Sequence, residues 1–393
     1  MPGSVLVASA RTPIGKLSGC FSRLPATDLG GRAIAAALER AGIAADQVDA
    51  VVMGQVLQAG AGQNPARQAA IAGGLPMEVP AVTVNNVCLS GLHAIAEADR
   101  LIRSGEAAVV IAGGMESMTR APHLLPDARA GFRLGDATAV DSLVHDGLWC
   151  AFDDVHMGAG TEAYAKGASI SRQAQDELAA ASHHRAAVAA KEGRFSDEIV
   201  PVAVPQRGEP LVVDADEGIR PDTSVESLAK LKPAFAAEGT ITAGNASQIS
   251  DGAAAVVVTS RAKAEELGLT PHAELVASAL VAGPDPSLLT QPSRAITRAL
   301  ERAGRSVADI DLFEINEAFA AVCIATVEDL GIDTGQVNVN GGAIALGHPI
   351  GMSGARLVVT LVDELRRRGG GLGAAALCGG GGQGAAALFE VST

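Results

Sequence analysis

The sequence predicts an α/β fold in which one α/β unit occurs twice, with a different segment inserted between the copies. The strongest sign is an internal repeat: residues 32–42 (RAIAAALERAG) return as residues 294–304 (RAITRALERAG), with nine of eleven positions identical. In each copy the pattern reads amphipathic helix, apolar strand, strand–turn–helix, strand. The chain has 393 residues, 48% hydrophobic and 19% charged, which is enough for a large buried core.

The repeat continues past the helix at an offset that grows from 262 to 266 residues, and each matched segment is of the same predicted type in both copies. The further matches are 48–54 with 310–316 (strand), 87–95 with 350–358 (turn into helix), and 109–114 with 375–380 (strand). We therefore expect an N-terminal domain over residues 1–270 and a C-terminal domain over residues 271–393.

Residues 118–250 differ from both copies and predict an inserted loop domain. They contain a stretch rich in proline and charge (RAPHLLPDARAGFRLGD), a long polar helix over 171–195 and a proline-bounded strand at 199–204. After them, residues 250–260 (SDGAAAVVVTS) predict a buried strand that returns to the first sheet, and residues 261–268 predict a closing helix.

Composition and charge exclude several function classes. The formal net charge is −14 and aromatic residues make up 3%, which argues against a nucleic-acid-binding surface. Every long apolar run is interrupted by glycine, proline or charge, so no membrane span is expected. The five cysteines are widely spaced, which argues against a disulfide scaffold or a metal site. With no signal peptide recognised, we expect a cytoplasmic protein.

Cys88 follows a β-branched strand (AVTVNNV) and precedes an amphipathic helix with apolar Leu92, Ile95 and Ile102 on one face. This places the thiol at the positive end of a helix dipole, where we expect a lowered pKa and a nucleophilic sulfur. A buried structural cysteine would fit the same pattern.

Three further positions carry polar chemistry. His348 lies in a glycine-rich segment whose turn corresponds to the Cys88 turn, so both are expected at the edge where α/β folds bind ligands. Cys378 ends a strand and enters CGGGGQG, where backbone N–H groups suit an oxyanion; a strand follows, so a dinucleotide site is rejected. Asn316 and Glu317 follow a buried strand, where a structural capping role also fits.

Together these segments resemble the thiolase family over essentially the whole chain. NNVCLSGL, NEAFA, NGGAIALGHPIGMSGAR and CGGGGQG occur in the family's order and approximate spacing. The resemblance implies a duplicated five-layer αβαβα fold, a loop domain between the halves and a homotetramer built as a dimer of dimers. It also implies reversible Claisen condensation of two acetyl-CoA to acetoacetyl-CoA plus coenzyme A, with an acyl-cysteine intermediate and no cofactor.

The resemblance assigns roles to the polar residues. Cys88 would be the acylated nucleophile, His348 would take its proton, and Cys378 would be the acid/base that deprotonates the α-carbon of the incoming acetyl-CoA. Asn316, through a bound water, and His348 would form one oxyanion hole. The backbone N–H groups of Cys88 and Gly380 would form the other.

A coenzyme A site is implied as well. Its residues would be Arg220 and Ser227 near the adenine and phosphates, Leu231 on the same wall, Ala243 and Ser247 along the pantetheine, and His156 and Met157 below the thioester. Arg220, Lys230 and Lys232 would supply positive charge for the phosphates, although a solvated helix face also explains the two lysines.

Two positions depart from the family pattern: Leu89 stands where many members carry glycine, and Leu289 where short-chain members often present methionine. Chain-length preference is therefore open, and the alternative is a 3-ketoacyl-CoA thiolase of β-oxidation that cleaves longer chains. Cys378 argues against a condensing enzyme of the ketoacyl-synthase type. The intact catalytic positions argue against a silent acyl-CoA-binding relative. Residues 124–126 are a candidate tetramer contact.

Overall fold

The computed structural model describes residues 3–392, most of which belong to a single large sheet and the helices that cover it. The strands of this sheet are β1 (Ser4–Arg11), β2 (Gly15–Lys16), β3 (Ala50–Gly54), β4 (Ala81–Val84), β5 (Val109–Ser117), β12 (Ser250–Ser260), β13 (Ala273–Ala282), β14 (Leu312–Ile315), β15 (Gly371–Gly379) and β16 (Gln383–Val391). Their order is β14-β15-β16-β13-β1-β12-β5-β3-β4, with β2 paired to β12.

The sheet consists of two halves with the same strand order. In the first half β1, β12 and β5 are antiparallel neighbours, and β3 and β4 continue in parallel. In the second half β13, β16 and β15 are antiparallel neighbours, and β14 continues in parallel. The halves join where β1 pairs with β13, at Val5–Glu274 and Leu6–Ala273. This confirms the duplicated α/β unit that the sequence repeat predicts.

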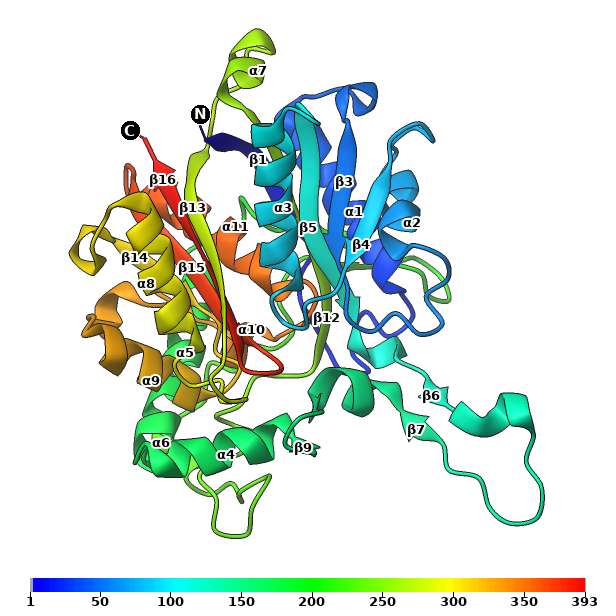
Figure 1. Cartoon of the computed structure of the whole chain (residues 1–393), viewed down its shortest axis with the longest axis vertical. Helices are drawn as coiled ribbons and strands as arrows, with labels where there is room; N and C mark the ends of the chain where they lie inside the picture. Colours follow the sequence, from blue (N-terminus) through cyan, green and yellow to red (C-terminus); the bar gives the residue numbers. More distant parts are fainter. Residues whose placement is uncertain (1–2, 393) are drawn as a thin grey trace.

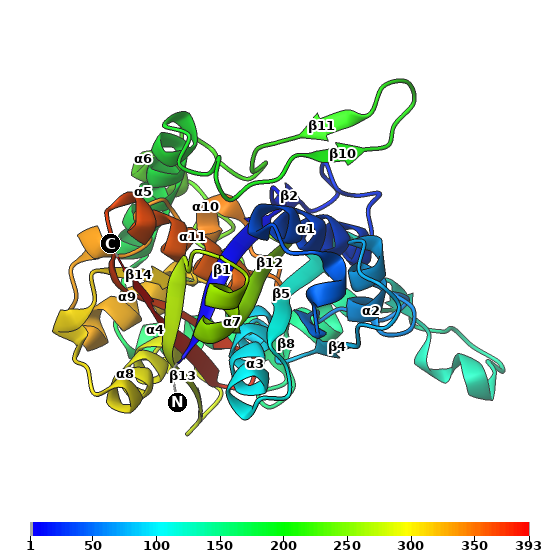
Figure 2. The ribbon, with the colours of Figure 1, turned by 90° about the horizontal axis from the view of Figure 1, so that it is seen from above.

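Helices complete the five expected layers. They are α1 (Ala26–Ala41), α2 (Pro65–Ala72), α3 (Ser90–Ser104), α7 (Arg261–Glu266), α8 (Gln291–Ala303), α9 (Ala320–Leu330), α10 (Ala343–Leu346) and α11 (Ser353–Arg367). In the middle layer α3 packs on β3 and β5, and α11 packs on β14 and β15 (Figure 1). On the outer faces α1 and α2 cover the first half of the sheet and α8 covers the second (Figure 2).

Glycines hold the two central helices at backbone contact. A Cβ atom on Gly91 would lie 2.8 Å from the backbone nitrogen of Ala355, and one on Gly354 would overlap the backbone of Leu92. Any larger residue would therefore force α3 and α11 apart. Because both glycines lie in the first turns of their helices, the turn before α3 and the turn before α11 lie next to each other.

The segment between the halves carries its own small elements. They are β6 (His123–Leu124), β7 (Val140–Asp141), β8 (Trp149–Cys150), β9 (Val155–His156), α4 (Met157–Gly167), α5 (Arg172–Lys191), β10 (Val202–Val204), β11 (Leu211–Val213) and α6 (Val225–Leu228). Figure 1 shows the β6–β7 segment projecting from the body, and it exposes Leu125, Phe132 and Leu134. Single helical turns occur at Ala45–Gln47, Met118–Arg120, Pro126–Ala130, Leu143–Leu148, Val307–Asp309 and Thr334–Gln336.

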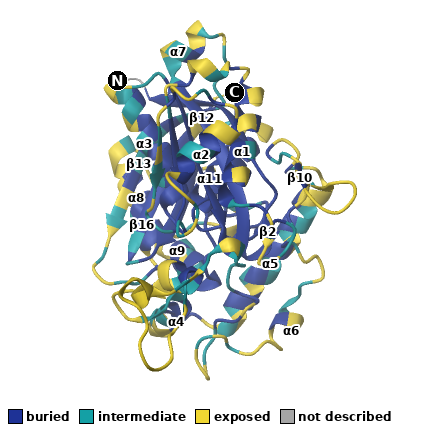
Figure 3. Ribbon diagram, turned by 90° about the vertical axis from the view of Figure 1, so that its right-hand side faces the viewer, coloured by how far each residue is buried: buried dark blue, intermediate teal, exposed yellow. Residues whose placement is uncertain are grey.

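A buried ion cluster anchors this segment to the first half. Arg11 at the end of β1 is fully buried and forms ion pairs with Asp216 at 2.7 Å and Glu198 at 3.2 Å. Figure 3 shows that buried residues concentrate in the sheet and its central helices, whereas exposed ones gather on the loops around α4, α6 and β10. Within residues 3–392 no helix combines the length and apolar character needed to cross a bilayer.

Candidate active site

Cys88 lies in the turn between β4 and α3, as its sequence context predicts, and is 8% exposed. The Ser90 hydroxyl donates to the Val87 carbonyl at 2.6 Å and accepts from the Asn86 N–H at 2.8 Å, which closes the turn. Val87 takes a left-handed φ of 48°, a conformation that costs energy for a β-branched residue. The turn therefore holds the thiol in one position at the start of the helix.

The expectation of a lowered Cys88 pKa is wrong. Burial raises the pKa of the Cys88 thiol to about 12, and the backbone N–H groups of Cys88 and Gly380 oppose this rise in part. Removal from water thus outweighs the favourable helix terminus. At neutral pH the thiol keeps its proton and needs a nearby base when it attacks. The two N–H groups that contact the sulfur are those that the resemblance assigns to an oxyanion hole.

This raised pKa predicts how Cys88 responds to pH. Alkylation by iodoacetamide, followed by mass spectrometry of the Cys88 peptide, should quicken about tenfold per pH unit from about pH 7 to about pH 9, because the thiolate reacts. A rate that is already constant below about pH 8 would instead reveal a preformed thiolate.

His348 lies in the turn before α11, and its ring is fixed at both nitrogens. Its Nδ1 is 2.5 Å from the Ser353 hydroxyl, which itself donates to the Pro349 carbonyl at 2.9 Å. Since that hydroxyl proton is used, Nδ1 carries the ring proton and Nε2 keeps its lone pair. Burial, together with a smaller contribution from the positive charge of Arg356, lowers the pKa of His348 to about 3. The imidazole is therefore neutral and able to accept a proton at Nε2.

Asn316 follows β14 and faces this basic nitrogen. Its Nδ2 lies 3.4 Å from His348 Nε2, and its own backbone N–H donates to the Ala376 carbonyl at 2.9 Å. The side chain is fully buried, yet its Oδ1 has no hydrogen-bond partner within residues 3–392. A buried side-chain oxygen without a hydrogen-bond partner is rare in packed interiors, and it is typical of a position that meets a ligand.

Glu317 uses its carboxylate to hold the surrounding loops in place. Its carboxylate accepts from the Ser182 hydroxyl at 2.7 Å, from Asn338 Nδ2 at 2.9 Å and from the Ile344 N–H at 3.1 Å. These contacts fix the segment that leads to His348. For Glu317 the structural alternative raised by the sequence is therefore the better description.

Cys378 ends β15 and is 1% exposed. Burial raises its pKa well above the usual range, and the Cys88 thiol contributes to this rise. The glycine turn beyond Cys378 lies over the Cys88 turn: a Cβ on Gly380 would be 3.3 Å from Val87 Cγ1. The two halves of the chain thus bring one cysteine each to a common site.

Leu89 packs under this glycine turn. It is fully buried, and a Cβ on Gly379 would come within 2.6 Å of Leu89 Cγ. The residue that departs from the family pattern therefore supports the end of β15, where Cys378 stands.

The predicted coenzyme A residues lie together on the loop domain. Arg220, Ser227, Leu231 and Ala243 are exposed, and Ser247 is half-buried. A Cβ on Gly244, next to Ala243, would contact the Leu231 side chain at 2.6 Å. The Ser227 hydroxyl donates to the Ser224 carbonyl at 2.7 Å and so helps to close α6.

Apolar side chains surround Cys378 on the side of the loop domain. Leu289 and Cys378 belong to one buried cluster, against which Met157 packs. His156 caps α4 by accepting from the Gly158 N–H at 3.1 Å, and its ring stacks on Phe235 with centroids 4.8 Å apart. Met157 therefore lies against the apolar cluster that contains Leu289 and Cys378, and His156 lies beside this cluster through its contact with Phe235.

Several contributors were missed in the sequence. Phe235 and Phe319 form an edge-to-face pair beside His156. Gln248 Nε2 donates to the carbonyls of Gly218, Ile344 and Ala345, and so joins the loop domain to the His348 segment. Ser353 is the first residue of α11 and lies five residues after His348. A serine at a helix start that closely follows this histidine is the one sequence signal that could have identified it.

Ser353 predicts a measurable effect. Replacing Ser353 with alanine removes the acceptor of His348 Nδ1–H, so the ring loses its fixed orientation. We expect kcat to fall about tenfold to a hundredfold, by analogy with the loss of an orienting partner of a histidine ligand, with little change in KM. Ser353→Thr keeps the hydroxyl and should retain more activity than the alanine variant; equal losses in both would contradict this role.

Comparison with known proteins agrees with this architecture. Residues 4–262 match the thiolase N-terminal domain and residues 269–391 match the thiolase C-terminal domain. The chain is 58% identical over 387 residues to the probable acetyl-CoA acetyltransferase of Mycolicibacterium smegmatis, covering 98% of this chain and all of that protein. It is 53% identical over 392 residues to the acetyl-CoA acetyltransferase of Cupriavidus necator, covering 99% and 100%. The chain therefore belongs to the thiolase family.

Proposed function

We propose that the protein is an acetyl-CoA acetyltransferase that interconverts two acetyl-CoA with acetoacetyl-CoA plus coenzyme A. The observation that carries the proposal is that the Cys88 turn packs against both the turn that carries His348 and the glycine turn that follows Cys378 in the other half of the chain. His348 is neutral, with an unprotonated Nε2, and both thiols are buried. Relatives that bear this name share 53% to 58% of its residues over nearly the full length.

In the first half-reaction the Cys88 sulfur attacks the thioester carbon while its proton passes to His348 Nε2. Attack and proton transfer are coupled because burial disfavours a Cys88 thiolate that forms before the attack. The carbon–sulfur bond to coenzyme A then breaks, and the departing thiolate takes the Cys378 proton. The products are acetylated Cys88, an imidazolium and a Cys378 thiolate, whose charges balance.

In the second half-reaction the Cys378 thiolate takes a proton from the α-carbon of a second acetyl-CoA. The enolate attacks the acetyl group on Cys88, and the released Cys88 sulfur regains its proton from His348. Each step creates negative charge on a thioester oxygen. One oxygen would be stabilised by the N–H groups of Cys88 and Gly380, and the other by His348 with Asn316 and a water, at roughly 3 to 4 kcal/mol per lost donor in other oxyanion holes.

Coenzyme A is a substrate and product here, and no further cofactor is proposed. The nucleotide would lie along Arg220, Ser227 and Leu231, and the pantetheine along Ala243 and Ser247. Arg220, Lys230 and Lys232 are exposed and supply local positive charge on a chain whose formal net charge is −14.

The assay that tests the proposal is thiolysis of acetoacetyl-CoA by coenzyme A, run beside 3-ketooctanoyl-CoA. Fast cleavage of the short substrate and slow cleavage of the long one is expected. The reverse preference would favour the β-oxidation alternative, and inactivity on both would refute the thiolase reaction.

A substitution at Leu289 tests the structural basis of this chain-length preference. It is 5% exposed in the apolar cluster that contains Cys378, so Leu289→Ala should enlarge the acyl pocket. We expect the ratio of kcat/KM for 3-ketooctanoyl-CoA over acetoacetyl-CoA to rise about tenfold. Leu288→Ala, at the neighbouring position of the same cluster, shows whether any such cavity suffices; an unchanged ratio in Leu289→Ala would exclude Leu289 as a determinant.

The remaining expectations also stand as proposals. We propose a cytoplasmic homotetramer in which the projecting β6–β7 segment contacts other subunits, because it exposes Leu125, Phe132 and Leu134. Light scattering tests this, and a monomer would contradict it. The division into domains at residue 270 is supported by the strand order, since the second half of the sheet begins with β13 at Ala273.

A further inference from the structure

Helix α5, which the sequence presents as a polar helix, packs between two functional regions. Its residues Ser182 and His183 are 3% and 1% exposed, whereas the next residue, His184, is exposed. One buried residue contacts the catalytic loops, and the other contacts the segment that carries Arg220. Two adjacent side chains of one helix, Ser182 and His183, therefore contact different parts of the site.

Ser182 contacts the catalytic side. Its hydroxyl donates to Glu317 Oε2 at 2.7 Å and accepts from the Gly342 N–H at 3.0 Å. Gly342 lies in the segment that leads to His348. The Ser182 hydroxyl therefore links the loop after β14 to the loop before α11.

His183 contacts the nucleotide side. Its Nδ1 accepts the backbone N–H of Arg220 at 3.1 Å, and burial lowers the pKa of His183 to about 4, so the ring stays neutral and can accept. At the other end of the same loop, Arg172 of α5 donates to the carbonyls of Leu228 and Leu231 at 2.7 and 3.0 Å. Loop 220–231 is thus held at both ends by α5.

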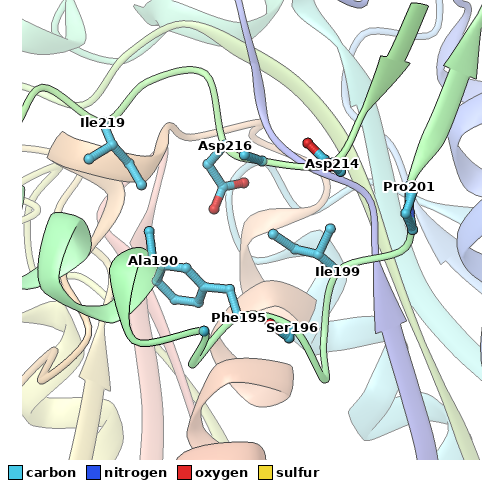
Figure 4. A pocket seen from close by; sticks show the side chains of 10 residues that line it. Ala190, Phe195, Ser196, Ile199, Pro201, Asp214, Asp216 and Ile219 are labelled. Carbon is cyan, nitrogen blue, oxygen red and sulfur yellow. The ribbon is translucent and has the colours of Figure 1, made fainter.

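The chain just before Arg220 lines a hollow beside the end of α5. A hollow of about 270 Å³ separates residues 214–219 from the end of α5 and the segment after it (Figure 4). Asp216 is fixed by Arg11 and the Gly218 carbonyl by Gln248. After Gly218, the next hydrogen bond that joins this chain segment to the body of the protein is the one from the Arg220 N–H to His183.

We propose that His183 is a positioning residue for coenzyme A, which fixes loop 220–231 so that Arg220, Ser227 and Leu231 face the nucleotide. This rests on the proposed function, because it assigns that loop to the nucleotide part of the substrate. The ring acts through the Arg220 backbone and touches neither the reacting atoms nor the thioester.

The test compares two matched substrate pairs: acetoacetyl-CoA with coenzyme A, and acetoacetyl-pantetheine with pantetheine, which lack the nucleotide. His183→Leu removes the acceptor and leaves the Arg220 N–H unpaired. We expect KM for coenzyme A to rise about fivefold to thirtyfold with kcat nearly unchanged. The pantetheine pair should show no change, because it does not reach loop 220–231.

His183→Gln and His184→Leu are the controls. Glutamine offers an acceptor oxygen and should restore much of the KM, whereas His184→Leu changes an exposed residue of the same helix and should behave as wild type. Equal losses on both substrate pairs, or an unchanged KM for coenzyme A in His183→Leu, would overturn the proposal. A wild-type protein inactive on both pairs would overturn the proposed function itself.

Ser182→Ala should change kcat rather than the KM for coenzyme A, in contrast to His183→Leu. Because Ser182 holds Glu317 and Gly342, its loss should lower kcat on both substrate pairs to a similar extent and leave the KM ratio between them unchanged. A selective effect of Ser182→Ala on coenzyme A would contradict the division of tasks along α5.

Discussion

Replacing Cys88 with alanine is expected to lower thiolysis and condensation of acetyl-CoA by roughly 10⁴-fold or more, because no other group can form the acyl intermediate. Helix α3 and its turn should persist, since the hydrogen bonds of Ser90 with Asn86 and Val87 do not involve the thiol. The measurement is steady-state kinetics in both directions, with the melting temperature as the check on folding.

Cys20→Ala is the matched control for this variant. Cys20 is half-buried and, like Cys88, is a free cysteine. Wild-type activity in Cys20→Ala would show that loss of a thiol alone is not harmful. Acyl transfer that persists in Cys88→Ala at a tenth of the wild-type rate would contradict the assignment of the nucleophile.

Replacing Cys378 with alanine should separate the two half-reactions. Condensation and thiolysis are expected to fall by about 10²- to 10⁴-fold, the usual contribution of a positioned acid or base. Acetylation of Cys88 by acetyl-CoA should fall less, because it uses Cys378 only to protonate the departing coenzyme A. Exchange of labelled coenzyme A into acetyl-CoA measures acetylation, and deuterium exchange at the acetyl methyl group measures proton abstraction.

The two exchange rates must respond differently for this scheme to hold. We expect deuterium exchange to be lost and coenzyme A exchange to be retained in part. If Cys378→Ala keeps deuterium exchange, the base lies elsewhere. Cys323→Ala changes another buried cysteine, on α9, and should leave both exchange rates near wild type.

The adjacent position of the Cys88 turn and the His348 turn could be predicted because the repeat fixes it. Residues 87–95 and 350–358 correspond in the two halves, and equivalent turns of a duplicated unit meet at the same edge of their sheets. The contacts at Gly91 and Gly354 place these two turns next to each other. Cys88 and His348 therefore needed no long-range information beyond the repeat.

The electrostatics could not be predicted in the same way. The turn before α3 was correct, yet the Cys88 pKa is raised rather than lowered. A helix terminus is visible in a local pattern, but desolvation depends on all the chain that covers the thiol, including Gly380 from the other half. The neutral state of His348 has the same origin, since burial is the largest cause of its low pKa.

The inserted segment was the least predictable part. In the sequence, residues 171–195 indicate only a long polar helix, and this pattern assigns His183 no particular role. In the structure His183 is buried, and its ring accepts a hydrogen bond from the backbone of Arg220, far along the chain. A single sequence carries no signal for such a pairing, as neither residue belongs to the repeat.

The most direct test of the acyl-transfer account is to find the acetyl group. The wild-type protein is mixed with acetyl-CoA, quenched in acid within the first turnovers, digested and analysed by mass spectrometry. The account predicts an acetyl group on the peptide that contains Cys88, removed when coenzyme A is added before the quench. An acetyl group that accumulates on Cys378 or on another cysteine, or an active enzyme that is never acetylated, would contradict it.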